Sequence, residues 1–534
     1  MKIYENCNVI TMDPGMPKAD SFAVIDGRFH LVGDRSKMEG CIKDGVETVD
    51  LKGRTVIPGL IETHNHISFY AANLTQVDCR PDVNAGIKEL MGKFAEQAKG
   101  RSENEWVQGW GYDDTLISDK RHLTVDDLDA VCPDSPVLIM HVTAHLGYVN
   151  SKALALAGVT PDTPDPSGGW IHHDASGRLS GLLIEPAAVE LVRAHVPVLN
   201  VAEMKGALTR AFQYYHQNGV TSTHDGAIGY SGDGREVIAA YRELEAEGRL
   251  NLRVYMTIVY NAYDRLIEIG LGNGMGSDLL KIGSVKMFQD GSIQAVTAAL
   301  TQDYHCEPGQ KGDLIFPQEA LEAMVEKYHS AGLQLAIHAN GDGAIESVLT
   351  ALEKAAKKCP RADTRHMIIH CQMASPDQIR RIKALGAIPS FFVNHVYYWG
   401  DRHLKLFLGR DRAERIDPLR SSLDEGLNFS LHSDLPVTPL SPIFSIHNAV
   451  NRVTRDGVVL GPEQRITPLE ALKAYTVDAA ACSFEDDRKG AIKDGYLADF
   501  VVLSADPLAV EPGGIKDIEV LATVVSGTKV YGGF

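Results

Sequence analysis

The chain has 534 residues, a formal net charge of −18, 44% hydrophobic residues and 23% charged residues. This acidic excess disfavours nucleic acid as a partner, because phosphate backbones bind basic surfaces. No apolar run reaches the length of about 18 residues that a membrane span needs, so we expect no membrane partner. The N-terminus lacks a signal peptide's apolar core, and the eight scattered cysteines are typical of reduced thiols in the cytoplasm.

The two ends of the chain have the pattern of short strands and turns. Residues 22–33 contain two apolar runs joined at Asp26-Gly27, which is a hairpin signal. Residues 490–504 and 520–531 have the same pattern of short apolar strands and turns. Neither end is long enough to form its own core, so we predict one composite β-sandwich domain from residues 1–53 and 485–534.

The central part, residues 54–484, is predicted to be an α/β barrel. Short apolar strands are expected at 54–62, 219–224, 252–259, 279–288, 333–338, 366–370, 387–392 and 427–432. Amphipathic helices are expected at 202–218, 236–248, 317–331, 343–358, 375–385, 418–425 and 468–480. Repeated βα units imply a parallel sheet, and eight of them favour a TIM-like (β/α)8 barrel with its active site at the carboxyl ends of the strands. A doubly wound open sheet is the alternative, but no Gly-rich phosphate fingerprint follows the first strand.

An insertion of about residues 70–200 separates the first and second barrel strands. It contains a predicted helix at 85–99, the aromatic stretch 106–114 and the turn-rich stretch 161–169. Insertions on the catalytic face of a barrel usually form a lid or a substrate wall. A structural appendage away from the site is the alternative.

Residues that bind metal ions stand at the ends of five predicted strands. The first strand ends in a His-x-His pair, whose rings share a face because alternate strand residues do. The ligand-type residues at these ends are His64, His66, Lys286, His338, His370 and Asp434. A single histidine that ends a strand is usually a core or rim residue. Ligand-type residues at five strand ends of one barrel mouth favour a metal site. Imidazole and carboxylate ligands suit one or two divalent ions, zinc first and Mn²⁺, Fe²⁺ or Co²⁺ as alternatives.

Lys286 can join such a site only in a modified or neutral form. An ammonium group has three donors and no lone pair, so it cannot bind a metal ion. A carbamate formed with CO2 would give an anionic bridge with two oxygens. The alternative is an ordinary lysine that pairs with Asp290 or with substrate.

Several motifs make the chain similar to a known family over nearly its whole length. They lie at residues 56–66 (VIPGLIETHNH), 145–154 (HLGYVNSKAL), 285–292 (VKMFQDGS), 338–344 (HANGDGA), 433–437 (SDLPV) and 490–503 (GAIKDGYLADFVVL). With them the chain resembles the metal-dependent amidohydrolase superfamily, and within it the branch that includes N-substituted formamide deformylases. The motifs are specific for the superfamily and much less so for a substrate.

The resemblance implies a role for each ligand. It implies that His64 and His66 hold the more buried metal ion. A carboxylated Lys286 would bridge this ion to a second one, held by His338 and His370.

It also implies that Asp434 contacts the first ion and acts as the general base. Two positions depart from the branch's pattern: Ile369 stands where Glu is frequent, and His432 stands where Gly is common before Ser433. Ile369 changes a contact behind the ligand His370, and His432 adds a polar group near the general base Asp434. Neither removes a ligand.

The activity we expect is hydrolysis of a non-peptide C–N bond in an N-substituted amide or formamide. A metal ion lowers the pKa of water toward ~7, and the resulting hydroxide attacks the carbonyl carbon. Asp434 takes the proton and delivers it to the departing nitrogen. The alternatives are hydrolysis of cyclic amides, esters or lactones, and a non-catalytic regulatory or binding protein on the same barrel.

The substrate is expected to be a small molecule, and homo-oligomer formation is left open. The loop 391–401 is aromatic, as are parts of the insertion, which would suit an apolar N-substituent; packing of the insertion on the barrel is the alternative. The candidate substrate-binding residues are Trp110, Tyr112, His145, Trp170, His224, Asp290 and His395.

Overall fold

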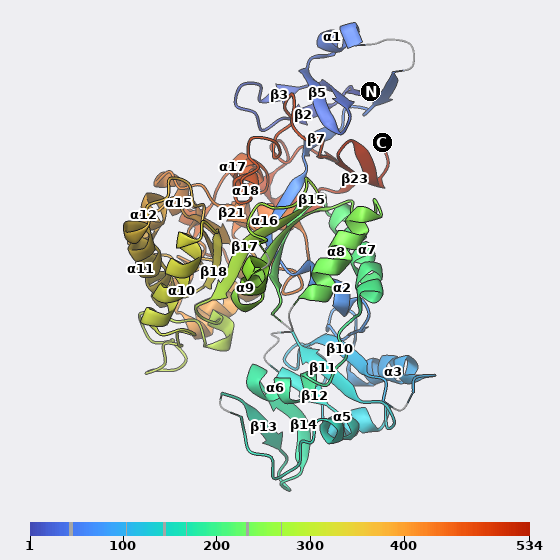
Figure 1. Ribbon diagram of the computed structural model, residues 1–534, viewed down its shortest axis with the longest axis vertical. Coiled ribbons are helices and arrows are strands. Elements are labelled where there is room, and N and C mark those ends of the chain that lie inside the picture. The colour runs from blue at the N-terminus through green and yellow to red at the C-terminus, as the bar shows by residue number, and fades with distance from the viewer. Residues whose placement is uncertain (42–45, 103, 143–145, 167, 231–233, 269) are drawn as a thin grey trace. The chain divides into compact units, whose positions relative to one another are not determined.

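The structure is a computed structural model that describes residues 1–41, 46–102, 104–142, 146–166, 168–230, 234–268 and 270–534 (Figure 1). The chain forms two compact units, one of Met1–Ile67 with Phe212–Phe534 and one of Ser68–Ala211. Within the described residues, no helix has both the length and the apolar character that crossing a membrane requires.

Eight parallel strands form the central sheet of the larger unit, as the alternation of strands and helices predicts. In spatial order they are β8 (Leu60–Asn65), β15 (Val220–Ile228), β16 (Arg253–Val259), β17 (Leu280–Phe288), β18 (Leu335–Ala339), β19 (Met367–His370), β20 (Ile388–Phe391) and β21 (Ser430–Leu431). The hydroxyl of Thr63 on β8 donates a 2.8 Å hydrogen bond to Oγ of Ser430 on β21. The sheet is therefore nearly closed, and the prediction of a (β/α)8 barrel is confirmed.

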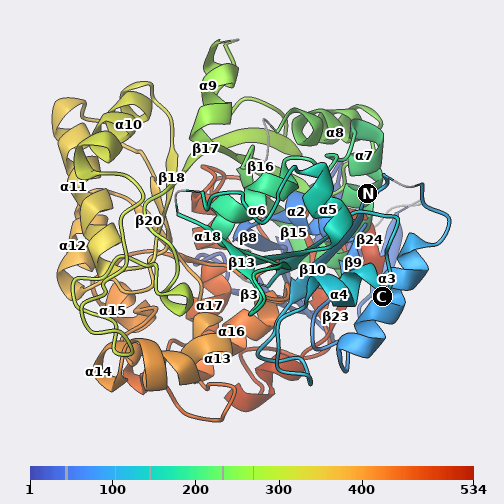
Figure 2. The ribbon, with the colours of Figure 1, turned by 90° about the horizontal axis from the view of Figure 1, so that it is seen from below.

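Helices follow the strands where the amphipathic pattern predicts them. They include α7 (Val201–Gln217), α8 (Arg235–Ala246), α10 (Gln318–Ser330), α11 (Asp342–Lys358), α12 (Pro376–Ala384), α15 (Leu419–Asp424) and α17 (Pro468–Ala474). Figures 1 and 2 show α10, α11 and α12 side by side as an outer layer beyond β18. The single helix predicted over 468–480 is instead two helices, because Thr476 has a non-helical backbone (φ −128°, ψ −96°) before α18 (Val477–Ala481) begins.

The strand predicted over 54–62 is also divided in two. Its first part, β7 (Thr55–Pro58), pairs with the terminal strands, and its second part, β8, enters the barrel. Gly59 joins them at a point of close approach, because a Cβ at this position would lie 2.1 Å from Oγ1 of Thr221. The chain thus passes from one sheet to the other where only glycine fits.

Strands from both ends of the chain meet in two small sheets. One contains β24 (Thr528–Gly532), β23 (Val520–Val525), β22 (Phe500–Leu503), β7, β2 (Asn8–Ile10) and β3 (Lys18–Ala19), in that order. The other contains β5 (Arg28–Gly33), β4 (Ser21–Ile25), β1 (Lys2–Glu5) and β6 (Glu47–Asp50). Asp26 and Gly27, with φ of 47° and 75°, form the predicted hairpin between β4 and β5.

An aromatic cluster packs between these two sheets. The ring of Phe22 on β4 lies 4.9 Å from that of Tyr4 and 5.1 Å from that of Phe500 on β22. All three side chains are buried in one core, so residues distant in sequence share a sandwich.

The smaller unit has its own sheet and core. Its strands, in spatial order, are β13 (Trp170–His173), β14 (Leu179–Ile184), β12 (Leu146–Val149), β11 (Val137–His141), β10 (Val107–Tyr112) and β9 (Val77–Asp78). The helix predicted at 85–99 is α3 (Ile87–Ala98), which buries Ile87, Leu90 and Phe94 at helical spacing. The role of the insertion as a lid or substrate wall stays a prediction.

Candidate metal centre

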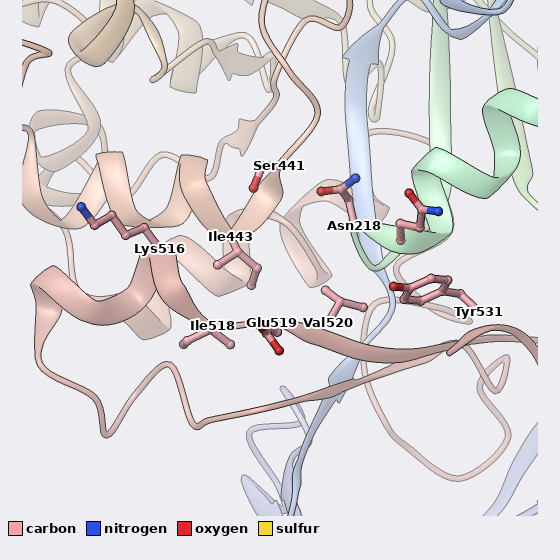
Figure 3. A pocket seen from close by; sticks show the side chains of 9 residues that line it. Asn218, Ser441, Ile443, Lys516, Ile518, Glu519, Val520 and Tyr531 are labelled. Carbon is pink, nitrogen blue, oxygen red and sulfur yellow. The ribbon is translucent and has the colours of Figure 1, made fainter. Parts of the chain in front are cut away.

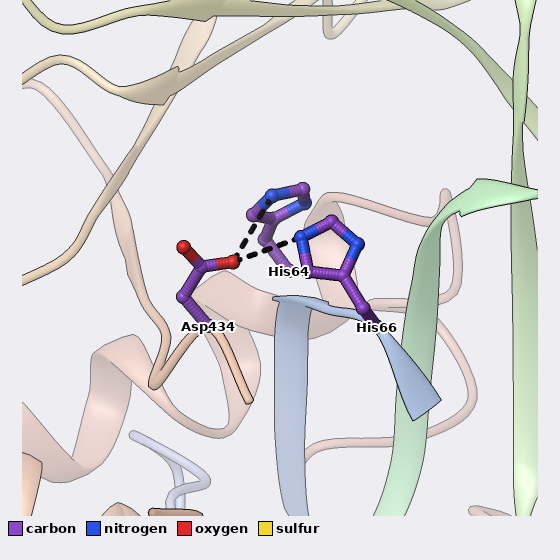
Figure 4. Close-up of side chains that lie close together, drawn as sticks. All are labelled: His64, His66 and Asp434. Carbon is purple, nitrogen blue, oxygen red and sulfur yellow. Dashed lines mark ion pairs between the residues drawn. The ribbon is translucent and has the colours of Figure 1, made fainter. Parts of the chain in front are cut away.

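The end of β8 brings His64 and His66 together, as their spacing predicts. Their ring centroids lie 5.0 Å apart, and Figure 4 shows both rings turned toward Asp434. Oδ1 of Asp434 lies 3.5 Å from Nε2 of His64 and 3.2 Å from Nε2 of His66. One ligand atom from each of the three residues lies within 4.8 Å of the others, a spacing at which a single ion can reach all three.

The loop after β21 holds Asp434 in its place. The backbone N–H of Ser433 donates to Oε2 of Glu62 at 3.0 Å, and the N–H of His66 donates to the carbonyl of Leu435 at 2.8 Å. Burial alone would raise the pKa of Asp434, but the hydrogen bond from His66, with smaller electrostatic contributions from His66, His432 and Lys286, lowers it below its ordinary value. Asp434 is therefore an ionised carboxylate, the form that binds metal ions and accepts protons.

The backbone at two of the predicted ligands is in an uncommon conformation. His370 and Asp434 have φ of 70° and 55°, and Cys371, beside His370, has φ of 50°. Such left-handed conformations cost about 1–3 kcal/mol each for non-glycine residues and persist where the surroundings fix them. They turn the chain sharply at the ends of β19 and β21, next to the ligand side chains.

Lys286 is fully buried on β17, beside the first histidine. Its Nζ lies 3.5 Å from Nε2 of His64 and 4.9 Å from the ring centroid of Phe288. Burial lowers the pKa of Lys286 from 10.5 to about 7, and the carboxylate of Asp434 offsets only part of this shift. A substantial fraction of this amine is thus neutral at neutral pH.

The remaining two histidines extend the group from β8 toward β18. The His370 ring centroid lies 5.5 Å from that of His64 and 4.6 Å from that of His338. Nδ1 of His338 lies 3.1 Å from Oδ1 of Asp290, which also accepts a hydrogen bond from the N–H of Asn340. The structure therefore brings all six predicted ligands into one continuous group, with Asp290 as a partner of His338.

Two other predicted site residues lie in the larger unit. The ring centroid of His395 lies 6.1 Å from that of His370, and its Nδ1 lies 3.5 Å from Oδ1 of the buried Asp417. His224 is buried on β15 and packs against Tyr255, with ring centroids 4.6 Å apart. His395 is thus a neighbour of the metal ligands, and a substrate contact by either histidine stays a prediction.

The other candidates belong to the smaller unit. Trp110 and Tyr112 are buried on β10, and the Tyr112 hydroxyl donates to the carbonyl of Arg121 at 2.7 Å. Trp170 is 54% exposed. His145 lies outside the described residues. Contact of these residues with substrate stays a prediction.

Sequence reasoning missed Glu62 and the partner of His432. Glu62 is fully buried, and burial raises its pKa to about 8. A carboxylate inside an apolar strand is a signal that could have found it. Nε2 of His432, the residue after β21, lies 3.2 Å from Nδ1 of His370 at the end of β19, a contact that no local sequence pattern predicts.

The smaller unit has a second group of ligand-type side chains that the sequence did not single out. One ligand atom from each of Asp113, Asp114 and His141 lies within 4.8 Å of the others. Nε2 of His141 lies 3.2 Å from Oδ1 of Asp114, so the group includes a close His–Asp contact.

A pocket of about 470 Å³ lies apart from the predicted ligands in the larger unit. Figure 3 shows Asn218, Ser441, Lys516, Glu519 and Tyr531 on its walls. None of the predicted site residues lines it, so the metal-ligand group at the barrel strand ends is the better candidate site.

The chain is similar to known proteins in sequence and in fold. The model of the amidohydrolase family matches residues 47–531. The putative amidohydrolase YtcJ of Bacillus subtilis (strain 168) is 30% identical, with 91% of this chain and 90% of that protein covered. The N-substituted formamide deformylase of Arthrobacter pascens is 30% identical, with 98% and 97% covered. An uncharacterized metal-dependent hydrolase from Pyrococcus horikoshii OT3 has a similar structure, with a TM-score of 0.81, 27% identity, and 96% and 99% of the chains covered.

The barrel is that of a metal-dependent hydrolase. The family match covers most of the chain, and the chain belongs to the amidohydrolase family.

Proposed function

We propose that the chain hydrolyses a non-peptide C–N bond of a small N-substituted amide or formamide. The family membership supports hydrolysis, and the formamide deformylase relative supports this substrate class. The single observation that carries the proposal is the group of His64, His66 and Asp434, because its three ligand atoms can surround one ion at the carboxyl ends of the barrel strands.

The donor set of the site fits divalent transition metals. His64, His66 and Asp434 would hold one ion, and His338 and His370 a second, with zinc first because imidazole and carboxylate are its common ligands. When bound, such an ion polarises a carbonyl group and acidifies water.

Lys286 enters the site as a carbamate in this proposal. Its amine is buried, and its pKa of about 7 leaves a neutral fraction that can attack CO2. The N–C bond forms as one C–O π bond of CO2 opens, and the amine gives one proton to water, which leaves an anion with two oxygens. This anion would neutralise part of the charge of two cations and bridge them.

Asp434 carries the proton in the reaction. Its carboxylate accepts a proton from the attacking water as the C–O bond forms, and it returns this proton to the nitrogen as the C–N bond breaks. The sum is one amide and one water converted to one carboxylic acid and one amine. Asp434 is buried, so bulk water has little access to the transferred proton.

Metal content and a substrate panel test the proposal together. The protein, purified without chelators, is analysed for bound metals by mass spectrometry, and we expect one or two equivalents per chain. The zinc-loaded protein is then assayed with N-formyl amines, N-acyl amino acids, cyclic ureides, esters and lactones, with the released amine or acid as the readout. We expect the fastest turnover with N-substituted amides or formamides.

Each other outcome contradicts a defined part of the proposal. Turnover confined to esters, lactones or cyclic ureides would overturn the substrate class and keep the hydrolase. No bound metal and no uptake on zinc addition would leave a non-catalytic protein on the same barrel.

A further inference from the structure

His432 stands directly after β21, and its ring is fixed on three sides. Its Nε2 lies 3.2 Å from Nδ1 of His370, and its Nδ1 lies 2.9 Å from Oγ of Ser390 on β20. Its ring stacks on Phe392, with centroids 5.3 Å apart and an angle of 17° between the planes. All four side chains are buried, so no bulk water competes for these contacts.

The hydrogen bonds continue from His432 across the barrel. Oγ of Ser390 lies 2.9 Å from Oγ1 of Thr63 on β8, and the Thr63 hydroxyl donates to Oγ of Ser430 at 2.8 Å. The connected side chains come from β19, β20, β8 and β21, the strands that carry or flank His64, His370 and Asp434.

The direction of each bond in this series follows from counting protons. Thr63 has one hydroxyl proton and gives it to Ser430, so Ser390 must donate to Thr63. Ser390 has then used its own proton, so Nδ1 of His432 must donate to Ser390.

The same count sets the protons of His370. The His432 ring is fully buried, and its two nitrogens contact a hydroxyl and an imidazole, so it is a neutral ring with its one proton at Nδ1. Nε2 of His432 is therefore an acceptor, and Nδ1 of His370 must be the donor to it. A neutral His370 with its proton on Nδ1 has its lone pair on Nε2, the nitrogen that could bind a metal ion.

We propose that His432 is a positioning residue for the metal centre: with Ser390 and Thr63 it fixes His370 with Nδ1 protonated and Nε2 available to the ion. This inference rests on the metal centre of the proposed function. Metal-binding histidines commonly donate their other ring N–H to an acceptor such as a carboxylate, a backbone carbonyl or water, and loss of this acceptor typically costs about 10–100-fold in metal affinity. Nε2 of His432 is the acceptor here.

The test compares the affinities of the sites for zinc. Wild-type protein and the His370→Ala, His432→Leu and His432→Gln variants are titrated with zinc against a competing chelator. His370→Ala identifies the ion that His370 holds. His432→Leu keeps the bulk of the side chain and removes both ring nitrogens. We expect it to weaken the binding of that same ion about 10–100-fold. The affinity of any other ion should change less than about threefold.

His432→Gln serves as the conservative control. A glutamine amide has both an acceptor for Nδ1 of His370 and a donor for Ser390, so its zinc affinity should lie within about fivefold of wild type. A residue that only fills space would give the opposite order, with His432→Leu the milder change. That order, or an equal loss of affinity for both ions, would overturn the inference.

Ser390→Ala provides a second test if His432→Leu does not fold. It removes the acceptor that sets the His432 proton, so we expect a smaller loss, confined to the ion that His370 holds. No loss in Ser390→Ala would also overturn the inference. If His370→Ala removes no ion, the ligand assignment of the proposed function fails instead.

Discussion

Arg253 on β16 donates hydrogen bonds of 2.6 and 2.8 Å to the two carboxylate oxygens of Asp499, which directly precedes β22. The two side chains are 3% and 6% exposed, and Arg253 also donates to Oγ of Ser526. A buried bidentate ion pair therefore joins a barrel strand to the sheet made by the two ends of the chain. It shows that the terminal strands are bound to the barrel through more than apolar contacts.

Asp499→Ala should strongly destabilise the larger unit. The substitution leaves the Arg253 guanidinium buried without its carboxylate, which costs about 3–5 kcal/mol in comparable proteins. Urea denaturation followed by fluorescence should show this loss in the free energy of unfolding. Lys405→Ala is the matched control, because it removes an ion pair with Asp456 whose side chains are 60% and 59% exposed. A surface pair is worth at most about 1 kcal/mol, so equal effects of the two variants would contradict the prediction.

Asp434→Asn should abolish turnover and leave the protein folded with bound metal. The amide keeps an oxygen toward His64 and His66 but cannot take a proton from water. Loss of a general base typically lowers kcat about 10²–10⁴-fold. The measurements are kcat with the best substrate of the panel and metal content by mass spectrometry. Retained full activity would remove Asp434 as the base, and loss of all metal would show a mainly structural role.

Lys286→Ala should lose activity that a small carboxylate restores in part. The variant removes the nitrogen that carries the proposed carbamate, and the space left near His64 can admit acetate, whose two oxygens resemble those of the lost group. Activity and zinc content are measured with increasing acetate, and chloride at equal ionic strength is the control. Restoration by acetate alone supports the bridging anion, whereas a Lys286→Ala variant with wild-type activity and zinc content would contradict it.

The barrel strands and the metal ligands could be predicted from the sequence because each leaves a local signal. Apolar runs alternate with amphipathic helices, and residues such as His338 and His370 stand at the ends of those runs. The division at Gly59 leaves no such signal, since it depends on contact with Thr221 on another strand.

The contacts that orient the ligands could not be predicted in this way. The pairing of His432 with His370 joins residues 62 positions apart and depends on the register of neighbouring strands. Local patterns specify which strands form, whereas the packing of the whole barrel decides which side chains meet.

Acid should destabilise the larger unit through a second buried histidine pair, His329 and His366. The N–H of Leu335 donates to Nδ1 of His366 at 3.0 Å, so the proton of the neutral His366 ring is on Nε2, 2.9 Å from Nδ1 of His329. Nε2 of His329 then donates to the carbonyl of Cys359 at 2.7 Å. Burial, with smaller contributions from His329 and Arg361, lowers the pKa of His366 from 6.5 to about 3. Protonation at Nδ1 would break the bond from Leu335.

The sign of the effect follows from the lowered pKa. Between pH 6.5 and 3 the unfolded chain binds a proton at His366 that the folded protein does not, so the free energy of unfolding falls as the pH falls through this range. This group alone should cost about 2 kcal/mol between pH 7.5 and pH 5. Urea denaturation at both pH values gives the free energy of unfolding of the metal-free wild type and of His366→Gln. In the difference between the two proteins, the titration of all other groups cancels. Glutamine can accept a hydrogen bond from the N–H of Leu335 but does not titrate. The wild type should therefore exceed the variant in free energy of unfolding by about 2 kcal/mol less at pH 5 than at pH 7.5. A gap that is the same at both pH values would show that His366 has an ordinary pKa in the folded protein.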